Sequence, residues 1–170
     1  GAGRYAGNDS AFTHYEAALA LAPEDARARA GIDALFDEAL AAADRALGAG
    51  DAEAARGVLG QAAALRPDDP ALAPRRVRLE RVAAAGAAAA DRERIDALLA
   101  RGDAALAALR LTSPPGDNAV EAYRAALRIA PDNAAARAGL LKVADRYVAL
   151  AQRSLDAGDL DAAEGHVAAA

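Results

Sequence analysis

The chain contains no cysteine, tryptophan or methionine, and only two phenylalanines and four tyrosines among its 170 residues. The absence of cysteine excludes a disulfide framework and a thiolate metal site. Apolar residues still make up 54% of the chain, and most of them are alanine. Alanine buries little side-chain area, but it lets helices approach one another closely. Because runs rich in Val, Ile and Thr are also absent, the sequence predicts an all-α protein.

Long apolar runs and a strong charge are missing as well. No stretch approaches the roughly 20 apolar residues that a membrane-spanning helix requires, and there is no signal peptide. The net charge of −5 fits a soluble protein better than a strong nucleic-acid binder. The sequence does not distinguish a cytoplasmic from a periplasmic location. The chain has no initiator methionine, which predicts that it is a piece of a longer protein.

An internal repeat organises what is present. The stretch Tyr15–Ile32 reads nearly the same as Tyr123–Leu140, and residues 11–62 align without a gap on residues 119–170, at an offset of 108. Matches between residues rarer than alanine carry the alignment. The most informative pairs are Tyr15/Tyr123, Pro23/Pro131, Arg29/Arg137, Gly31/Gly139, Asp37/Asp145, Gly50/Gly158 and Asp51/Asp159. The fold is therefore expected to consist of repeated units.

Apolar residues recur at helical spacing between start and stop signals along most of the chain. In residues 25–48, for example, Ile32, Leu35 and Phe36 begin one apolar face. A flexible stretch is expected at residues 1–9. The predicted helices cover residues 10–22, 25–48, 51–65, 70–110, 118–130, 133–157 and 159–170.

Local signals support several of these helix ends. Residues 8–10 (Asn-Asp-Ser) provide an N-cap for the first helix. At Gly50–Asp51 and Gly158–Asp159 the glycine favours a left-handed helix end and the aspartate opens the next helix. Asn118 with Glu121 three residues later has the spacing of a capping box.

Two glycines lie inside predicted helices. Gly31 and Gly139 are repeat counterparts, and each costs about 1 kcal/mol in a helix interior relative to alanine. Their recurrence predicts close helix crossings at these positions.

Residues 69–111 are ambiguous because they carry two apolar faces about 150° apart at about 100° per residue. Supercoiling corrects only about 20° per heptad. Either the helix breaks near Gly86, or one long helix packs against different neighbours at its two ends. We favour one long helix over about 70–110, which gives four helices per repeat. The first face contains Leu72, Leu79, Val82, Ala83, Gly86 and Ala90, and the second contains Ile95, Leu98, Gly102, Ala105, Leu106 and Leu109.

Residues 37–67 resemble the tetratricopeptide repeat. In that family two antiparallel helices join at a Gly-Asp-type turn, small residues sit where the helices cross, and a proline closes the second helix. Here Ala43 and Ala55 match the small residues, Gly50–Asp51 the turn and Pro67 the closing proline. The resemblance implies helical hairpins in a right-handed solenoid, although the first helices of the hairpins are longer than in the family.

No group of residues in the sequence has the spacing of a catalytic or metal site. His14 and His166 have no Asp, Glu or His at the i+4 spacing of a helical metal pair, and neither pairs with a serine. Gly1–Gly7 lacks the preceding strand of a phosphate loop. The basic cluster Pro74–Arg81 is not gathered on one side of a helix and has no interleaved aromatic residue. We therefore expect no enzyme activity, cofactor, metal or nucleic-acid partner.

The resemblance implies a non-catalytic scaffold that binds a protein or peptide partner on a groove lined by first helices. Leu40 and Val148 are expected to stay partly exposed there as apolar anchors. A structural role, in which the long helix drives self-association with another copy, is the alternative. The candidate groove residues are Asp37, Leu40, Ala41 and Asp44, with Asp145, Val148, Ala149 and Gln152 as their counterparts.

Overall fold

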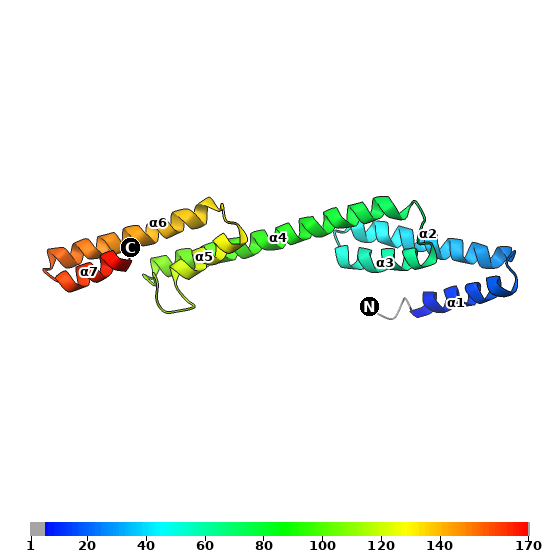
Figure 1. Cartoon of the computed structure of the whole chain (residues 1–170), viewed down its shortest axis with the longest axis horizontal. Coiled ribbons are helices and arrows are strands. Elements are labelled where there is room, and N and C mark those ends of the chain that lie inside the picture. The colour runs from blue at the N-terminus through cyan, green and yellow to red at the C-terminus, as the bar shows by residue number, and fades with distance from the viewer. Residues whose placement is uncertain (1–5, 170) are drawn as a thin grey trace. The chain divides into compact units, whose positions relative to one another are not determined.

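The computed structural model describes residues 6–169, and this part of the chain contains seven α-helices and no strand (Figure 1). The all-α prediction is therefore confirmed. The helices are α1 (Ala6–Leu21), α2 (Ala26–Gly48), α3 (Ala52–Leu65), α4 (Leu72–Ala107), α5 (Ala119–Ile129), α6 (Ala134–Asp156) and α7 (Leu160–Ala169).

Helix α4 runs without a break through Gly86, so the two apolar faces of residues 69–111 belong to one helix. The start of α1 differs from expectation. Because α1 begins at Ala6, residues 8–10 lie within the helix and do not cap it. Residues 1–9 were expected to be flexible, but residues 6–9 belong to α1. Residues 1–5 lie outside the described part of the chain.

The turns of the hairpins α2–α3 and α6–α7 have the same conformation. Gly50 and Gly158 both have a φ of 77°, in the left-handed region that glycine adopts without a steric penalty. The carboxylates of Asp51 and Asp159 each accept a hydrogen bond from the backbone N–H three residues further on, at 2.9 and 3.0 Å. The predicted glycine and aspartate signals are confirmed in both copies.

The chain divides into two compact units, Gly1–Ala88 and Ala89–Ala170, and the division falls within α4. The first half of α4 packs into the core of unit 1 through Leu72 and Leu79. The second half packs into the core of unit 2 through Ile95, Leu98 and Ala105. The two apolar faces of α4 thus serve two different cores, which is why no single stripe runs along the helix.

The core of unit 1 joins α2, α3 and the start of α4. It is closed by Leu72, which is 1% exposed. Two ion pairs lie beside it: Arg75 on α4 holds the carboxylate of Asp44 on α2 through both Nε (3.1 Å) and a terminal nitrogen (2.6 Å), and Arg66 pairs with Asp33. The buried residues of this core are Phe36, Leu40, Ala43, Val58, Leu59, Ala62 and Leu72.

The core of unit 2 joins the end of α4, α5 and the first half of α6. Tyr123 on α5 is 1% exposed at its centre. Its hydroxyl donates a hydrogen bond to the carboxylate of Asp103 at 2.7 Å. Burial, with a smaller contribution from Asp103, raises the pKa of Tyr123 well above its usual value. The buried residues of this core are Ala105, Leu111, Ala119, Tyr123, Ala126, Ala136 and Val143.

The ring of Tyr123 lies against two helix glycines. A Cβ atom added to Gly139 on α6 would lie 2.4 Å from the ring, and one added to Gly102 on α4 would lie 2.6 Å from it. In the first copy a Cβ on Gly31 would lie 2.3 Å from the ring of Tyr15. The recurring glycines therefore mark close crossings, as the sequence predicts.

The buried residues of the two cores come from different parts of the repeat. Tyr123 is 1% exposed, whereas its counterpart Tyr15 is half-buried. Conversely, Leu40 is 8% exposed in the first copy and its counterpart Val148 is 59% exposed in the second. Each copy is packed where a half of α4 covers it: the first copy at its α2–α3 hairpin, the second at α5.

The capping of α5 is confirmed in part. The side chain of Asn118 accepts a hydrogen bond from the N–H of Glu121 at 2.9 Å, as an N-cap does. However, the Glu121 carboxylate accepts from the N–H of Gly116 at 2.7 Å. The reciprocal bond of a capping box would go to Asn118 itself. Instead, the amide of Asn118 donates to the carbonyl of Pro114 at 3.0 Å, so these bonds order the turn before the helix.

Enlarging a residue at the crossing of α2 and α3 should destabilise unit 1. Ala55 is fully buried, with no exposed area, and Ala54 beside it is exposed. Ala55→Leu is expected to lower the free energy of unfolding by about 1–3 kcal/mol because the added atoms overpack the crossing. Ala54→Leu, the matched control, should change it by less than about 0.5 kcal/mol. Urea denaturation measures both, and equal shifts would contradict the crossing.

Candidate partner-binding surface

The four candidate groove residues of the first copy do not form an open groove. Asp37 and Ala41 are exposed on α2. Leu40, at 8% exposed, is buried in the core of unit 1, so the expectation that it stays partly open to solvent is wrong. Asp44 is engaged by Arg75 from α4. The start of α4 covers the side of α2 on which Leu40 lies.

The four counterparts in the second copy are all exposed on α6. Val148 is 59% exposed, as expected. Asp145 and Ala149 line a hollow of about 280 Å³ together with Leu106 at the end of α4. Gln152 donates a hydrogen bond to the carboxylate of Asp156 at 2.9 Å, so this bond lies within α6.

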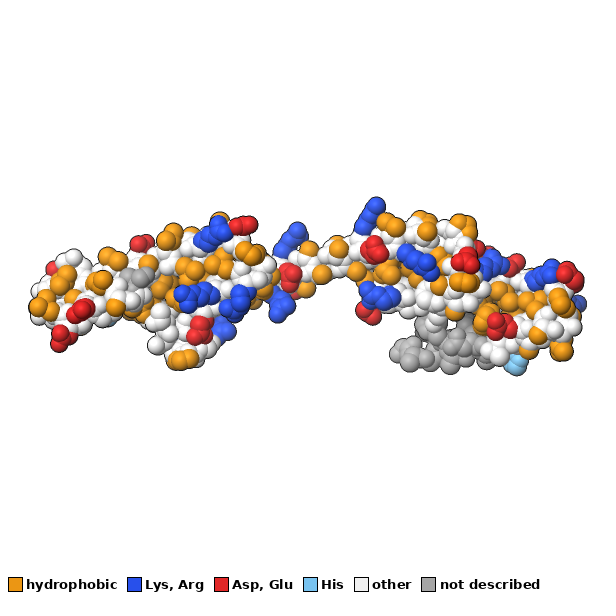
Figure 2. All heavy atoms as spheres, viewed as in Figure 1, with side chains coloured by type: hydrophobic (Ala, Val, Ile, Leu, Met, Phe, Trp, Pro, Cys, Tyr) orange, Lys and Arg blue, Asp and Glu red, His pale blue; other side chains and the backbone are white. Residues whose placement is uncertain are grey.

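Within the described residues, the α6–α7 hairpin exposes five large apolar side chains, Leu141, Val148, Leu155, Leu160 and Val167, and three of them have leucine counterparts in the first copy. Val148 and Leu155 lie seven residues apart on α6 and are 59% and 47% exposed, and Val167 on α7 is 63% exposed. We call these three residues the α6–α7 face. In Figure 2 hydrophobic side chains lie on the surface of α6 and α7, at the left of the view.

Leu155 and Val167 are absent from the candidate residues taken from the sequence. The repeat contains a signal for them, because their counterparts are Leu47 and Leu59, both 3% exposed in unit 1. A position that is apolar in both copies is expected to face a neighbouring helix.

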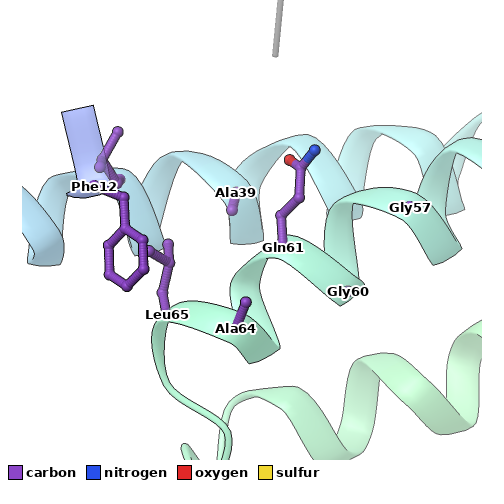
Figure 3. A pocket seen from close by; sticks show the side chains of 8 residues that line it. Phe12, Ala39, Gly57, Gly60, Gln61, Ala64 and Leu65 are labelled. Atoms are coloured by element: carbon purple, nitrogen blue, oxygen red, sulfur yellow. The ribbon is translucent and has the colours of Figure 1, made fainter. Parts of the chain in front are cut away.

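A further hollow of about 320 Å³ lies in unit 1 between α1, α2 and α3 (Figure 3). Phe12 of α1 and Leu65 of α3 stand close together at one end of it in this view. Small residues leave the space open, among them Ala39 and Gly57. The sequence analysis did not identify this hollow. Its lining is Phe12, Leu35, Ala39, Gly57, Gly60, Gln61, Ala64 and Leu65.

The second copy has a large residue where Ala39 lies in the first. Its counterpart is Tyr147, whose hydroxyl lies 2.6 Å from that of Thr112. The Tyr147 ring also lies against His166 of α7, with centroids 6.3 Å apart. Alignment of the two copies could have indicated this hollow, because the first copy has the small Ala39 where the second has the large Tyr147.

The histidines and the basic cluster do not assemble a chemical site. His14 is exposed, and His166 is half-buried beside Tyr147. Arg75, from the basic cluster, forms an ion pair with Asp44. Within residues that the structure describes, no three His, Cys, Asp or Glu side chains group where they could hold a metal ion. None of the described helices has the length and apolar character needed to cross a membrane.

The end of the second hairpin should open more readily than its counterpart. Helix α3 buries Ala55, Val58, Leu59 and Ala62, whereas Ala163 is the buried residue of α7 within its described length. Local opening is easiest where few apolar groups are buried. We expect the backbone amides of residues 161–169 to exchange with solvent much faster than those of residues 53–61. Hydrogen exchange read by mass spectrometry measures this, and equal protection would show that α7 is covered in solution.

Comparison with known proteins supplies no further assignment, because no protein-family model, no curated protein and no solved structure matches the chain.

Proposed function

We propose that the chain is a non-catalytic scaffold that binds a protein partner through the α6–α7 face. The observation that carries this proposal is the exposure of Val148, Leu155 and Val167, at 47–63%. Single exposed apolar residues are common on protein surfaces, but a group of them bordered by polar residues is typical of an interaction site. The border here includes Asp145 and Gln152, which are exposed.

The two helices of the hairpin that presents this face pack against each other on its inner side. Ala163 of α7 is 3% exposed and Ala151 of α6 is 4% exposed, so small residues lie at the crossing of the two helices. The apolar side chains of the α6–α7 face are not part of this crossing. They lie on a second side of α6 and α7, which the described residues leave open.

We also propose that the fold is a tetratricopeptide-like right-handed solenoid. Antiparallel helices joined at Gly50–Asp51, with Ala43 and Ala55 fully buried where the helices meet, support this proposal. The lengths of the helices depart from the family. Both α2 and α6 have 23 residues, and α4 has 36.

Self-association is the alternative function. The middle of α4, residues 84–94, is exposed throughout and would be available to a second copy. This stretch contains alanine, glycine and charged residues, so it offers less apolar area than the α6–α7 face. Sedimentation equilibrium separates the two functions. A monomer over the whole concentration range supports the scaffold, and a concentration-dependent dimer supports self-association.

Site-specific photo-crosslinking tests the proposed binding directly. A photoreactive amino acid is placed at Val148 and, as a matched control, at Ala138, which is exposed on the same helix. In an extract of the source cells we expect a covalent protein adduct at position 148 and none at position 138. The mass of the adduct shows whether the partner is another protein or a second copy. No adduct at position 148, or equal adducts at both positions, would contradict the proposal.

A further inference from the structure

The two copies of the repeat provide a direct comparison between a covered hairpin and an open one. The α2–α3 and α6–α7 hairpins share the same turn, with φ of 77° at both glycines, and the same aspartate caps. Their crossing residues Ala55 and Ala163 are both buried. The hairpins therefore have matching local geometry, and a difference in exposure between counterparts reports on what lies outside each hairpin.

That difference is large at three positions. Leu40, Leu47 and Leu59 are 8%, 3% and 3% exposed, whereas their counterparts are 59%, 47% and 63% exposed. The counterparts are Val148, Leu155 and Val167, the α6–α7 face. On the first hairpin the start of α4 closes the core, with Leu72 fully inside it and Leu79 packed against it.

We infer that the α6–α7 face is the docking site for an amphipathic α-helix of the same kind as the start of α4. This inference rests on the proposed protein-binding function and names the class of partner. The partner helix carries two leucines or similar residues at the spacing of Leu72 and Leu79. Those residues cover Val148 and Val167, as Leu72 and Leu79 cover the α2–α3 hairpin.

The charges around the two hairpins show how the partner helix differs from α4. The start of α4 is anchored on the first hairpin by Arg75, which holds the carboxylate of Asp44. The counterpart of Asp44 is Gln152, which carries no charge. An arginine placed opposite Gln152 would lose water without gaining a carboxylate. The partner therefore has an uncharged polar residue in place of Arg75.

Leu141 also extends the surface on which the helix lies. It is on α6, seven residues or about two turns before Val148, and both side chains are more than half exposed. In the first copy the corresponding place holds the ion pair of Asp33 with Arg66, the residue that ends α3. The second copy thus has an apolar side chain and an uncharged amide where the first has two carboxylates, which selects against a basic helix such as α4 itself.

A synthetic peptide tests the inference on the full chain. It carries residues 70–88 with Arg75→Gln, and its binding is followed by fluorescence anisotropy. We expect saturable binding. Adding Leu72→Asp to the peptide should weaken the binding about tenfold or more, because a central apolar anchor is lost. The unmodified peptide, which keeps Arg75, should also bind less tightly than the modified one.

Variants of the chain locate the peptide. Val148→Asp and, separately, Val167→Asp should each weaken binding about tenfold or more, whereas Ala138→Asp should leave it unchanged. Both valines are exposed, so circular dichroism should show the same helix content in all variants. No binding of the modified peptide, or binding that neither valine variant affects, would overturn the inference.

The outcome separates this inference from the proposed function. If the photoreactive group at position 148 captures a protein but the modified peptide does not bind, the scaffold function stands and the helical partner is wrong. If the chain dimerises and Val148→Asp abolishes the dimer, a second copy occupies the face and the inference is likewise overturned.

Discussion

Replacing Tyr123 by alanine is expected to lower the free energy of unfolding of unit 2 by about 3–5 kcal/mol. The ring is 1% exposed and is in contact with both Gly102 of α4 and Gly139 of α6. Its removal leaves a cavity between three helices that cannot close without moving them. The variant also leaves Asp103 without the hydroxyl donor that lies 2.7 Å from its carboxylate. Urea denaturation followed by circular dichroism, with hydrogen exchange of α5 and α6, measures the loss.

The matched control is Tyr15→Ala at the counterpart position of the first copy. Tyr15 contacts Gly31 on one side but is only half-buried. The loss should therefore be clearly smaller than for Tyr123, because less apolar area is removed from the protein interior. Tyr123→Phe separates the ring from the hydroxyl and should cost about 1 kcal/mol. Equal losses for the two alanine variants would show that the second half of α4 does not enclose Tyr123 in solution.

The helices and turns could be predicted because their signals are local. Gly50 and Gly158 mark a conformation that other residues avoid, and the aspartates that follow them cap the next helix whatever the rest of the chain does. Gly31 and Gly139 were recognised because a costly residue recurs at the same place in both copies. The start of α1 was misplaced because residues 8–10 are cap-forming types, yet the helix continues through them.

The division of α4 between two cores could be predicted only as an alternative. The two apolar faces of residues 69–111 showed that the helix has different neighbours at its two ends. They did not show which hairpin each end covers, because that depends on contacts between residues distant in the sequence. The consequence was an error at Leu40. Its helix was assigned by resemblance to an open groove, whereas Leu72 and the ion pair of Asp44 with Arg75 place that side of the helix under α4.

The same comparison of copies identifies two residues that were not among the candidate groove residues. Leu155 and Val167 are ordinary helix residues by spacing. They become informative only when Leu47 and Leu59, their counterparts, are found buried. The candidate surface in the second copy is thus defined by what covers the first, and the helix that does so places Leu72 inside the core of unit 1.

Replacing Leu72 by alanine is therefore expected to lower the free energy of unfolding of unit 1 by about 2–5 kcal/mol. Leu72 is 1% exposed and joins the start of α4 to the cluster of Phe36, Leu40 and Leu59. Its truncation leaves a cavity in that cluster and weakens the attachment of α4 to α2 and α3. A dye that fluoresces on exposed apolar surfaces should bind the variant more strongly, because Leu40 and Leu59 become accessible as Val148 and Val167 already are.

Val77→Ala on the same helix is the matched control. Val77 is 49% exposed, and alanine has the higher helix propensity, so the free energy of unfolding should change by less than about 0.5 kcal/mol. Urea denaturation of both variants gives the comparison, and hydrogen exchange of α2 and α3 shows where the structure loosens. If Leu72→Ala loses no more stability than Val77→Ala, the start of α4 does not close the first hairpin. The α6–α7 face would then have no covered counterpart, and its exposure would no longer indicate a missing helical partner.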